Sequence, residues 1–180
     1  AVLQKTGVPL PETTFHLLDL ERELVPVIVQ EALPEASMMR DQMLRADSAQ
    51  AIILLEAAAN VIADFWNNLA NDGLRVGFHP SIRNFAIVNG QAIFFDTFPP
   101  LIHYNRAEMG RVLLQFSEKR LMRILGPLVR GTVTSIQDEW YSPPETFVGL
   151  VGSACRLRPE DRALFLDWGN GFVTRRMPRW

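Results

Sequence analysis

The sequence predicts an α+β protein with a mostly helical body and strands in two places. Two apolar runs near the N-terminus, residues 14–20 and 25–33, are rich in strand-forming residues, and two shorter apolar runs flank Asn89-Gly90. Between these pairs lies a long apolar stretch, residues 47–70, with helical spacing. We therefore expect a short N-terminal strand pair, a long helix, a β-hairpin and then further helices.

Composition and charge narrow the class of protein. A chain of 180 residues can bury the core of one domain, and 48% hydrophobic with 21% charged residues is ordinary for a globular protein. The net charge of -2 gives no electrostatic basis for binding nucleic acid or an anionic membrane. The single cysteine, Cys155, suits a reducing compartment, and we expect neither a transmembrane helix nor a signal peptide. These features predict a cytoplasmic protein that binds neither nucleic acid nor membranes.

The N-terminal runs come first in chain order. Residues 14–20 (TFHLLDL) and residues 25–33 (VPVIVQEAL) are separated by three charged residues, 21–23, and this pattern predicts two antiparallel strands. Pro34 then ends the sheet.

The stretch 47–70 predicts a helix that is buried on most sides. Apolar side chains recur with helical spacing at Ile52, Leu55, Ala59, Ile62 and Trp66. Asp47 or Ser48 is a typical N-cap, and residues 71–73 (NDG) are typical of a helix end.

A hairpin is the most informative feature of the chain. Residues 85–88 and 92–95 flank Asn89-Gly90, which tolerates the positive φ angles of a two-residue turn, so the two runs should pair. Pairing brings Asn84, just before the first strand, beside Asp96, just after the second. Amide and carboxylate oxygens are hard ligands that Mg²⁺ accepts, with phosphates and water completing its octahedron.

Each residue near this hairpin also has a plainer interpretation. Asp96 could cap backbone amides of a turn, and Asn84 could bond backbone groups of its own loop, a role compatible with metal binding. His79 could be a base, a neutral hydrogen-bonding residue or a surface residue. Arg83 could contact a phosphate or pair with an acid at the surface.

The spacing resembles the catalytic and metal loops of the protein-kinase-like superfamily. Members carry a catalytic Asp, a metal-binding Asn five residues later, a hairpin, and then the metal-binding Asp of Asp-Phe-Gly. Asn84 and Asp96 match the second and third positions, with Asp96-Thr97-Phe98 in place of Asp-Phe-Gly, whereas His79 replaces the catalytic Asp. The Pro and small residues of this loop make the segment similar to aminoglycoside and small-molecule phosphotransferases.

The order of elements extends this resemblance over residues 13–100. In the kinase-like fold two strands lead through a hinge to the large lobe, where a long buried helix precedes the catalytic loop. The resemblance implies that residues 1–34 are a remnant of the small lobe and hinge and that residues 35–180 form the helical large lobe. Only twelve residues precede Thr13, so we expect the chain to lack the glycine-rich loop and strand Lys at the front of a small lobe.

The same resemblance implies ATP and Mg²⁺ as cofactors. Asn84 and Asp96 would hold the metal, Arg83 would lie near the phosphates, and the hinge, residues 29–33 with Gln30, Glu31 and Leu33, would bond adenine. These hinge residues could equally be the end of a core strand.

Two functions follow from the resemblance and stay open. The first is an ATP-dependent phosphotransferase that acts on a small molecule with His79 in the position of the base. The second is a catalytically silent kinase-like protein that binds a ligand or protein partner as a scaffold, because a neutral imidazole lacks the negative charge that orients an alcohol. A helical protein without kinase ancestry is a third interpretation.

The second half of the chain predicts helices. Apolar residues at three- and four-residue spacing cover residues 106–116, 118–128 and 129–140. Ser142 followed by two prolines, and residues 158–161 (RPED), are typical helix starts. The final residues 175–180 (RRMPRW) predict a frayed or docked tail.

Overall fold

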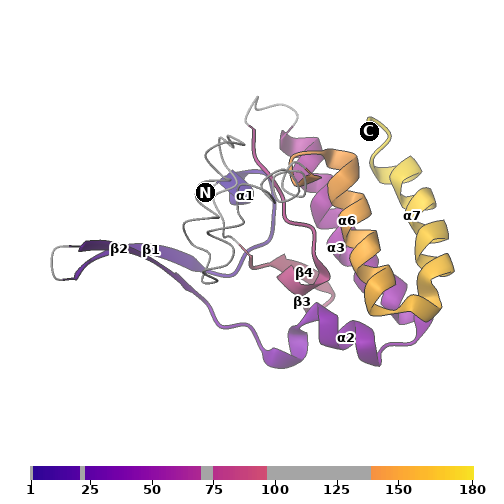
Figure 1. The fold of residues 1–180 in the computed structure, drawn as a ribbon, viewed down its shortest axis with the longest axis horizontal. Coiled ribbons are helices and arrows are strands. Elements are labelled where there is room, and N and C mark those ends of the chain that lie inside the picture. Colours follow the sequence, from indigo (N-terminus) through magenta and orange to yellow (C-terminus); the bar gives the residue numbers. More distant parts are fainter. Residues whose placement is uncertain (1, 21–22, 70–74, 97–138) are drawn as a thin grey trace, which may run out of the picture.

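The structure, a computed structural model, describes residues 2–20, 23–69, 75–96 and 139–180. The helices are α1 (Val2–Lys5), α2 (Met39–Arg45), α3 (Ser48–Leu69), α6 (Pro143–Leu157) and α7 (Arg162–Arg176), and the strands are β1 (Thr13–Leu20), β2 (Glu23–Gln30), β3 (Phe85–Val88) and β4 (Gln91–Phe94). Helices α3, α6 and α7 lie side by side, and α2 and the β3–β4 hairpin pack against α3 (Figure 1). The fold is therefore α+β, as the sequence predicts.

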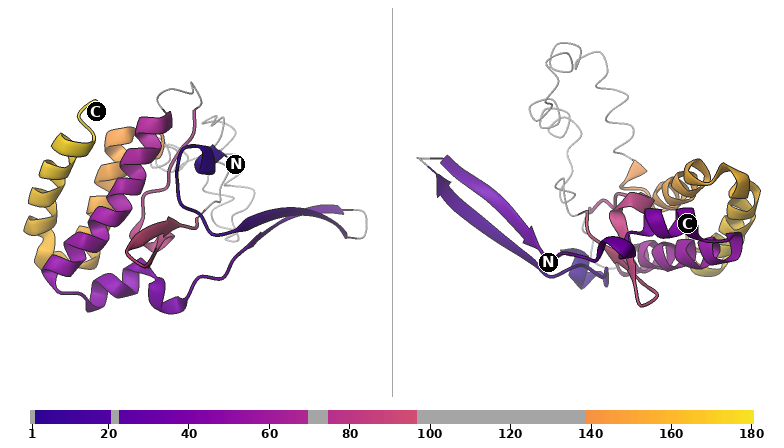
Figure 2. Two further views of the ribbon diagram at one scale, coloured as in Figure 1. Left: turned by 180° about the vertical axis from the view of Figure 1, so that it is seen from behind. Right: turned by 90° about the horizontal axis from the view of Figure 1, so that it is seen from below.

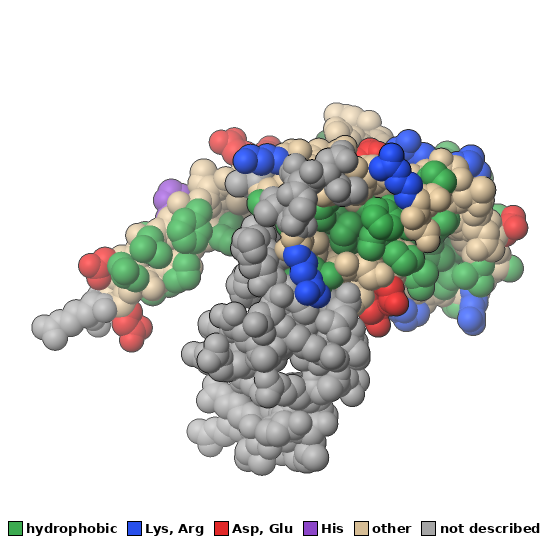
Figure 3. Space-filling model, turned by 90° about the horizontal axis from the view of Figure 1, so that it is seen from above, with side chains coloured by type: hydrophobic (Ala, Val, Ile, Leu, Met, Phe, Trp, Pro, Cys, Tyr) green, Lys and Arg blue, Asp and Glu red, His purple; other side chains and the backbone are tan. Residues whose placement is uncertain are grey.

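The N-terminal strand pair is confirmed and projects from the helical body (Figures 1 and 2). Thr13 lies opposite Gln30 and Leu20 opposite Glu23, so the second strand ends three residues before its predicted end. Every residue of β1 is exposed, and hydrophobic side chains gather on the surface of the strand pair (Figure 3). The strand pair therefore adds no side chain to the described core, and the predicted division of the chain after residue 34 stays a prediction.

Helix α3 is the central helix of the core. The carboxylate Oδ1 of Asp47 accepts the N–H of Gln50 at 2.8 Å, which confirms Asp47 as the N-cap. Eleven of its side chains are buried, because the helix is covered by α6, α7, α2 and the hairpin. By length and composition alone α3 could cross a membrane, but its apolar face is the one packed in this core. The predicted helix end at residues 71–73 lies outside the described residues.

The predicted hairpin forms with its predicted turn. Asn89 and Gly90 have φ angles of 51° and 79°, and Phe85 lies opposite Phe94. Four buried aromatic rings fix the hairpin against α3 and the preceding loop: Phe65, Phe78, Phe85 and Phe94. The Phe78 and Phe94 ring centroids are 4.4 Å apart, so the base of the hairpin is rigidly packed.

The C-terminal helices begin where the sequence predicts. Helix α6 starts directly after Ser142, and the turn Pro159–Asp161 leads into α7. The tail is docked, because Met177 is buried and the guanidinium of Arg176 lies 2.8 Å from Asp64 of α3. The predicted helices over residues 106–116 and 118–128 and most of residues 129–140 lie outside the described residues.

A buried ion pair joins the ends of three helices. The guanidinium of Arg158 donates to Asp161 and to the backbone carbonyls of Met43 and Ala46, and the hydroxyl of Ser48 donates to Asp161 at 2.6 Å. Arg158 and Asp161 are each 8% exposed. These bonds fix the turn between α2 and α3 against the end of α6.

Candidate functional site

The loop before β3 is held between the core and a segment next to α6. Phe78 is buried in the aromatic cluster, and its backbone N–H donates to the carbonyl of Trp140 at 2.7 Å. His79 follows directly, with about a third of its side chain exposed. The buried neighbour therefore fixes the position of a histidine that solvent can reach.

Two hydrogen bonds connect the three residues that the sequence singles out. The Nδ1 of His79 lies 2.7 Å from Oδ2 of Asp96, and the Nδ2 of Asn84 donates to the backbone carbonyl of His79 at 3.2 Å. The N–H of Phe95 donates to the Asn84 carbonyl at 3.1 Å, which closes the open end of the hairpin. Asn84 therefore bonds its own loop, while Asp96 contacts the side chain that replaces the kinase base.

The direction of these bonds sets the chemistry of each group. A carboxylate only accepts hydrogen bonds, so the contact with Asp96 places a hydrogen on Nδ1 of His79. In the neutral ring Nε2 is then the lone-pair nitrogen, which can accept a proton. The amide nitrogen of Asn84 is engaged by the loop, so its amide oxygen is the atom suited to a cation.

Two aromatic residues pack on the loop that carries His79. The Trp140 ring stacks on the His79 imidazole with centroids 4.4 Å apart and planes 29° apart. The Tyr141 ring packs on Gly77, where a Cβ atom would lie 2.7 Å from its Cζ. Only glycine fits this contact without displacing the ring. No local pattern in the sequence marks Trp140 as a neighbour of His79.

The side chains of Asp96 and Asn84 could bind a hard cation only together with ligands from a nucleotide or from water. Asp96 offers the carboxylate of a side chain that is about a quarter exposed, and Asn84 offers one amide oxygen. Within the described residues no group of three or more His, Cys, Asp or Glu side chains could hold a metal. A Mg²⁺ ion here would therefore need phosphate and water oxygens, as is usual for Mg²⁺ bound with a nucleotide.

A family model described as a family of unknown function, DUF6206, matches residues 1–180. The chain belongs to this family. No curated protein and no solved structure matches the chain. The description of DUF6206 assigns no activity.

The predicted hinge of this DUF6206 chain lies where the strand pair returns to the body. The side chain of Gln30 donates to Thr13 at 3.3 Å, and the N–H of Glu31 donates to the carbonyl of Glu12 at 2.8 Å. Leu33 is half-buried. Adenine binding by Gln30, Glu31 and Leu33 stays a prediction. A bond from the Glu31 N–H to adenine would replace its present bond to Glu12.

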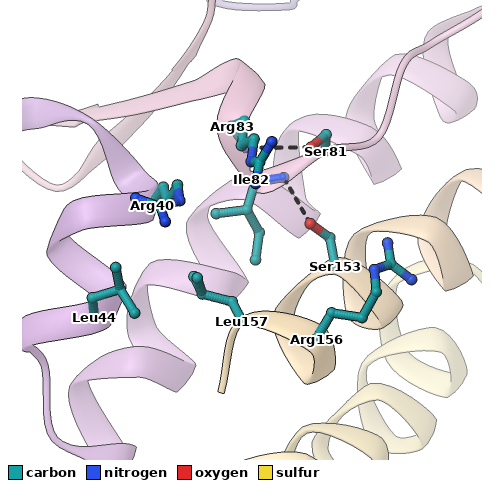
Figure 4. Close-up of a pocket in the computed structure, with 8 residues that line it drawn as sticks. All are labelled: Arg40, Leu44, Ser81, Ile82, Arg83, Ser153, Arg156 and Leu157. Carbon is teal, nitrogen blue, oxygen red and sulfur yellow. Dashed lines mark hydrogen bonds between the residues drawn. The ribbon is translucent and has the colours of Figure 1, made fainter. Parts of the chain in front are cut away.

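Arg83 is exposed and lies beside Asn84 in sequence, but it lines a separate pocket. This pocket of about 610 Å³ lies between α2, the loop before β3 and α6 (Figure 4). His79, Asn84 and Asp96 are not among its lining residues. Contact of Arg83 with a nucleotide phosphate stays a prediction. No signal in the sequence marks the other two arginines that line this pocket, Arg40 and Arg156.

Proposed function

We propose that this chain is a kinase-like protein that binds Mg²⁺ and ATP at the loop carrying His79, Asn84 and Asp96, and that it transfers phosphate to a small molecule. The observation that carries the proposal is the chain of contacts from the Asn84 amide to the His79 carbonyl and from the His79 ring to Asp96. These contacts gather, at one end of a hairpin, the three residues whose spacing resembles a kinase loop.

His79 and Asp96 would work together as the base. As a substrate hydroxyl attacks the terminal phosphorus of ATP, its proton would pass to Nε2 of His79 while the bond to the ADP oxygen breaks. Asp96 orients the ring through Nδ1 and would stabilise the imidazolium that forms. The Trp140 ring limits rotation of the imidazole.

Asn84 and Asp96 are the residues that would hold Mg²⁺. The ion, when bound, would neutralise charge that develops on the phosphates. Asp96 would then have two partners, because Oδ2 already contacts His79 and Oδ1 is the oxygen left for the metal. A neutral His79 permits this arrangement, whereas an imidazolium would repel Mg²⁺.

A catalytically silent kinase-like protein is the second candidate. It is favoured by the 2.7 Å contact itself, because His79 engages the carboxylate that is the strongest metal ligand on offer. The exposed apolar side chains of the strand pair would suit a scaffold that binds a protein partner. Under this alternative, nucleotide binding would be weak or independent of metal.

Calorimetric titration of the full-length protein with ATP tests the proposal. We expect binding that requires Mg²⁺ and that weakens at least about tenfold in Asp96→Ala, as expected when a charged ligand group is lost. Asp167→Ala, which removes an exposed carboxylate on α7, is the matched control and should leave the affinity unchanged. Equal affinity with and without Mg²⁺ would contradict the proposal.

A further inference from the structure

We propose that the pocket between α2, the loop before β3 and α6 binds a small organic molecule that carries a phosphate monoester. The pocket measures about 610 Å³, within the range of small-molecule sites. Three arginines from three segments line it: Arg40 of α2, Arg83 of the loop and Arg156 of α6 (Figure 4). Arginines that line one pocket from separate segments suit a dianion that can accept several bonds.

Among the described residues, only one of the three arginines has an acidic partner. Arg40 contacts Asp41 at 3.0 Å, and both side chains are more than 40% exposed, so this pair is weakly held. Among the described residues, Arg83 and Arg156 make no ion pair, and the side chains that line the pocket include no Asp or Glu. The described lining is therefore a positively charged surface that an anion would neutralise.

Two serine hydroxyls add neutral donors to this surface. Ser153 Oγ accepts the N–H of Ile82, and Ser81 Oγ accepts the N–H of Arg83, each at 3.4 Å (Figure 4). Because each oxygen already accepts a backbone N–H, each hydroxyl hydrogen is directed elsewhere and can be donated to a ligand. The polar side chains of the lining are thus all donors or hydroxyls, which matches the acceptor oxygens of a phosphate.

The apolar part of the lining indicates an organic ester rather than a bare ion. Leu44 of α2 and Leu157 of α6 line the pocket on the side away from Arg83 and Ser81 (Figure 4). Leu44 is 50% exposed, so a ligand there would remove apolar surface from water. A phosphate at the arginines and a carbon skeleton against the leucines would fill both parts of the pocket.

This site does not depend on the proposed nucleotide site. None of the residues that connect His79, Asn84 and Asp96 lines the pocket, and the arginines do not contact those residues in any described ion pair. The loop is shared, because Arg83 precedes Asn84. The experiment below therefore reports on the pocket whether or not ATP binds.

Phenyl phosphate is a suitable probe, because it joins a phosphate monoester to an apolar ring. We expect saturable calorimetric binding to the full-length protein that weakens about tenfold in Arg83→Gln and in Arg156→Gln, since each variant removes a charge-assisted bond. Arg45→Gln changes the same charge at an exposed position of α2 outside the pocket, and should alter the affinity less than about twofold. Unchanged melting temperatures of the variants would show that they fold.

Three results would overturn the proposal. The first is no saturable binding of phenyl phosphate, including the case in which vesicles containing phosphatidic acid bind and phenyl phosphate does not. The second is equal weakening by Arg45→Gln and the two pocket variants. The third is binding of inorganic phosphate as tight as that of phenyl phosphate, which would leave no role for the apolar side. Binding of both phenyl phosphate and the vesicles, weakened by the pocket variants, would support the phosphomonoester site and extend it to lipid headgroups.

Discussion

The Nδ1 of His79 lies 2.7 Å from Oδ2 of Asp96, so the residue in the position of a kinase base contacts the residue in the position of a metal ligand. This contact fixes the imidazole together with the stacked Trp140 ring. It also couples the proposed role of His79 as a base to that of Asp96 as a metal ligand, because a change in the charge of His79 alters the electrostatic potential at Asp96. The chemistry of the site therefore depends on whether His79 carries a proton.

The first prediction separates an enzyme from a silent protein. In the full-length protein we expect weak phosphotransfer or ATP hydrolysis that falls in His79→Ala with little change in nucleotide affinity, and rises modestly in His79→Asp. Robust turnover that survives His79→Ala would show that another group is the base.

Asn84 should contribute to stability through its loop bond. Asn84→Ala removes the amide that donates to the His79 carbonyl, and we expect the free energy of unfolding to fall by about 1 to 2 kcal/mol in chemical denaturation. Asn170→Ala, at an exposed position of α7, should change it by less than about 0.5 kcal/mol. Similar small effects of both variants would mean that the Asn84 bond does not hold the loop.

The close packing of α6 on the loop predicts opposite effects at two glycines. A Cβ at Gly149 would lie 2.8 Å from Cγ of Pro80, so Gly149→Ala should lower stability by about 1 to 3 kcal/mol. At Gly152 a Cβ would meet only the flexible end of Arg156, at 3.3 Å. Gly152→Ala should therefore be neutral or stabilise by up to about 1 kcal/mol through helix propensity. Thermal unfolding of both variants checks this, and a stabilising Gly149→Ala would contradict the packing.

Breaking the buried ion pair between Arg158 and Asp161 should cause a large loss of stability, part of which a second substitution should restore. Arg158→Met should destabilise the fold by about 3 to 5 kcal/mol, because it leaves the Asp161 carboxylate buried without its partner. The double variant Arg158→Met/Asp161→Leu should recover part of that loss, while Arg162→Met at an exposed position should have little effect. Denaturant unfolding measures all three, and a double variant less stable than Arg158→Met would argue against the explanation.

Local signals made the hairpin and the long helix predictable from sequence. Asn89-Gly90 determines its own turn conformation, and Asp47 caps a helix whose apolar spacing is continuous. Both depend on residues that are neighbours in the chain. For the same reason the hydrogen bonding of Asn84 within its own loop could be anticipated.

Contacts between distant segments could not be predicted from sequence. The stacking of Trp140 on His79 is a contact between distant segments. The placement of Arg40, Arg83 and Arg156 around one pocket depends on how α2 and α6 pack around the loop. The exposure of the strand pair was equally unpredictable. Its apolar side chains suggest burial, yet no described element covers them.

The central claim is that a metal and nucleotide bind beside His79, and paramagnetic NMR tests it most directly. Mn²⁺ in place of Mg²⁺, added with ATP to the full-length protein, should broaden the ring signals of His79 and the side-chain amide signals of Asn84. His16, on the projecting strand β1, is the internal control, and its ring signals should stay sharp. Asp96→Ala should abolish the selective broadening. Unchanged His79 signals at saturating Mn²⁺ and ATP, or equal broadening of His16 and His79, would contradict a metal and nucleotide site at this loop.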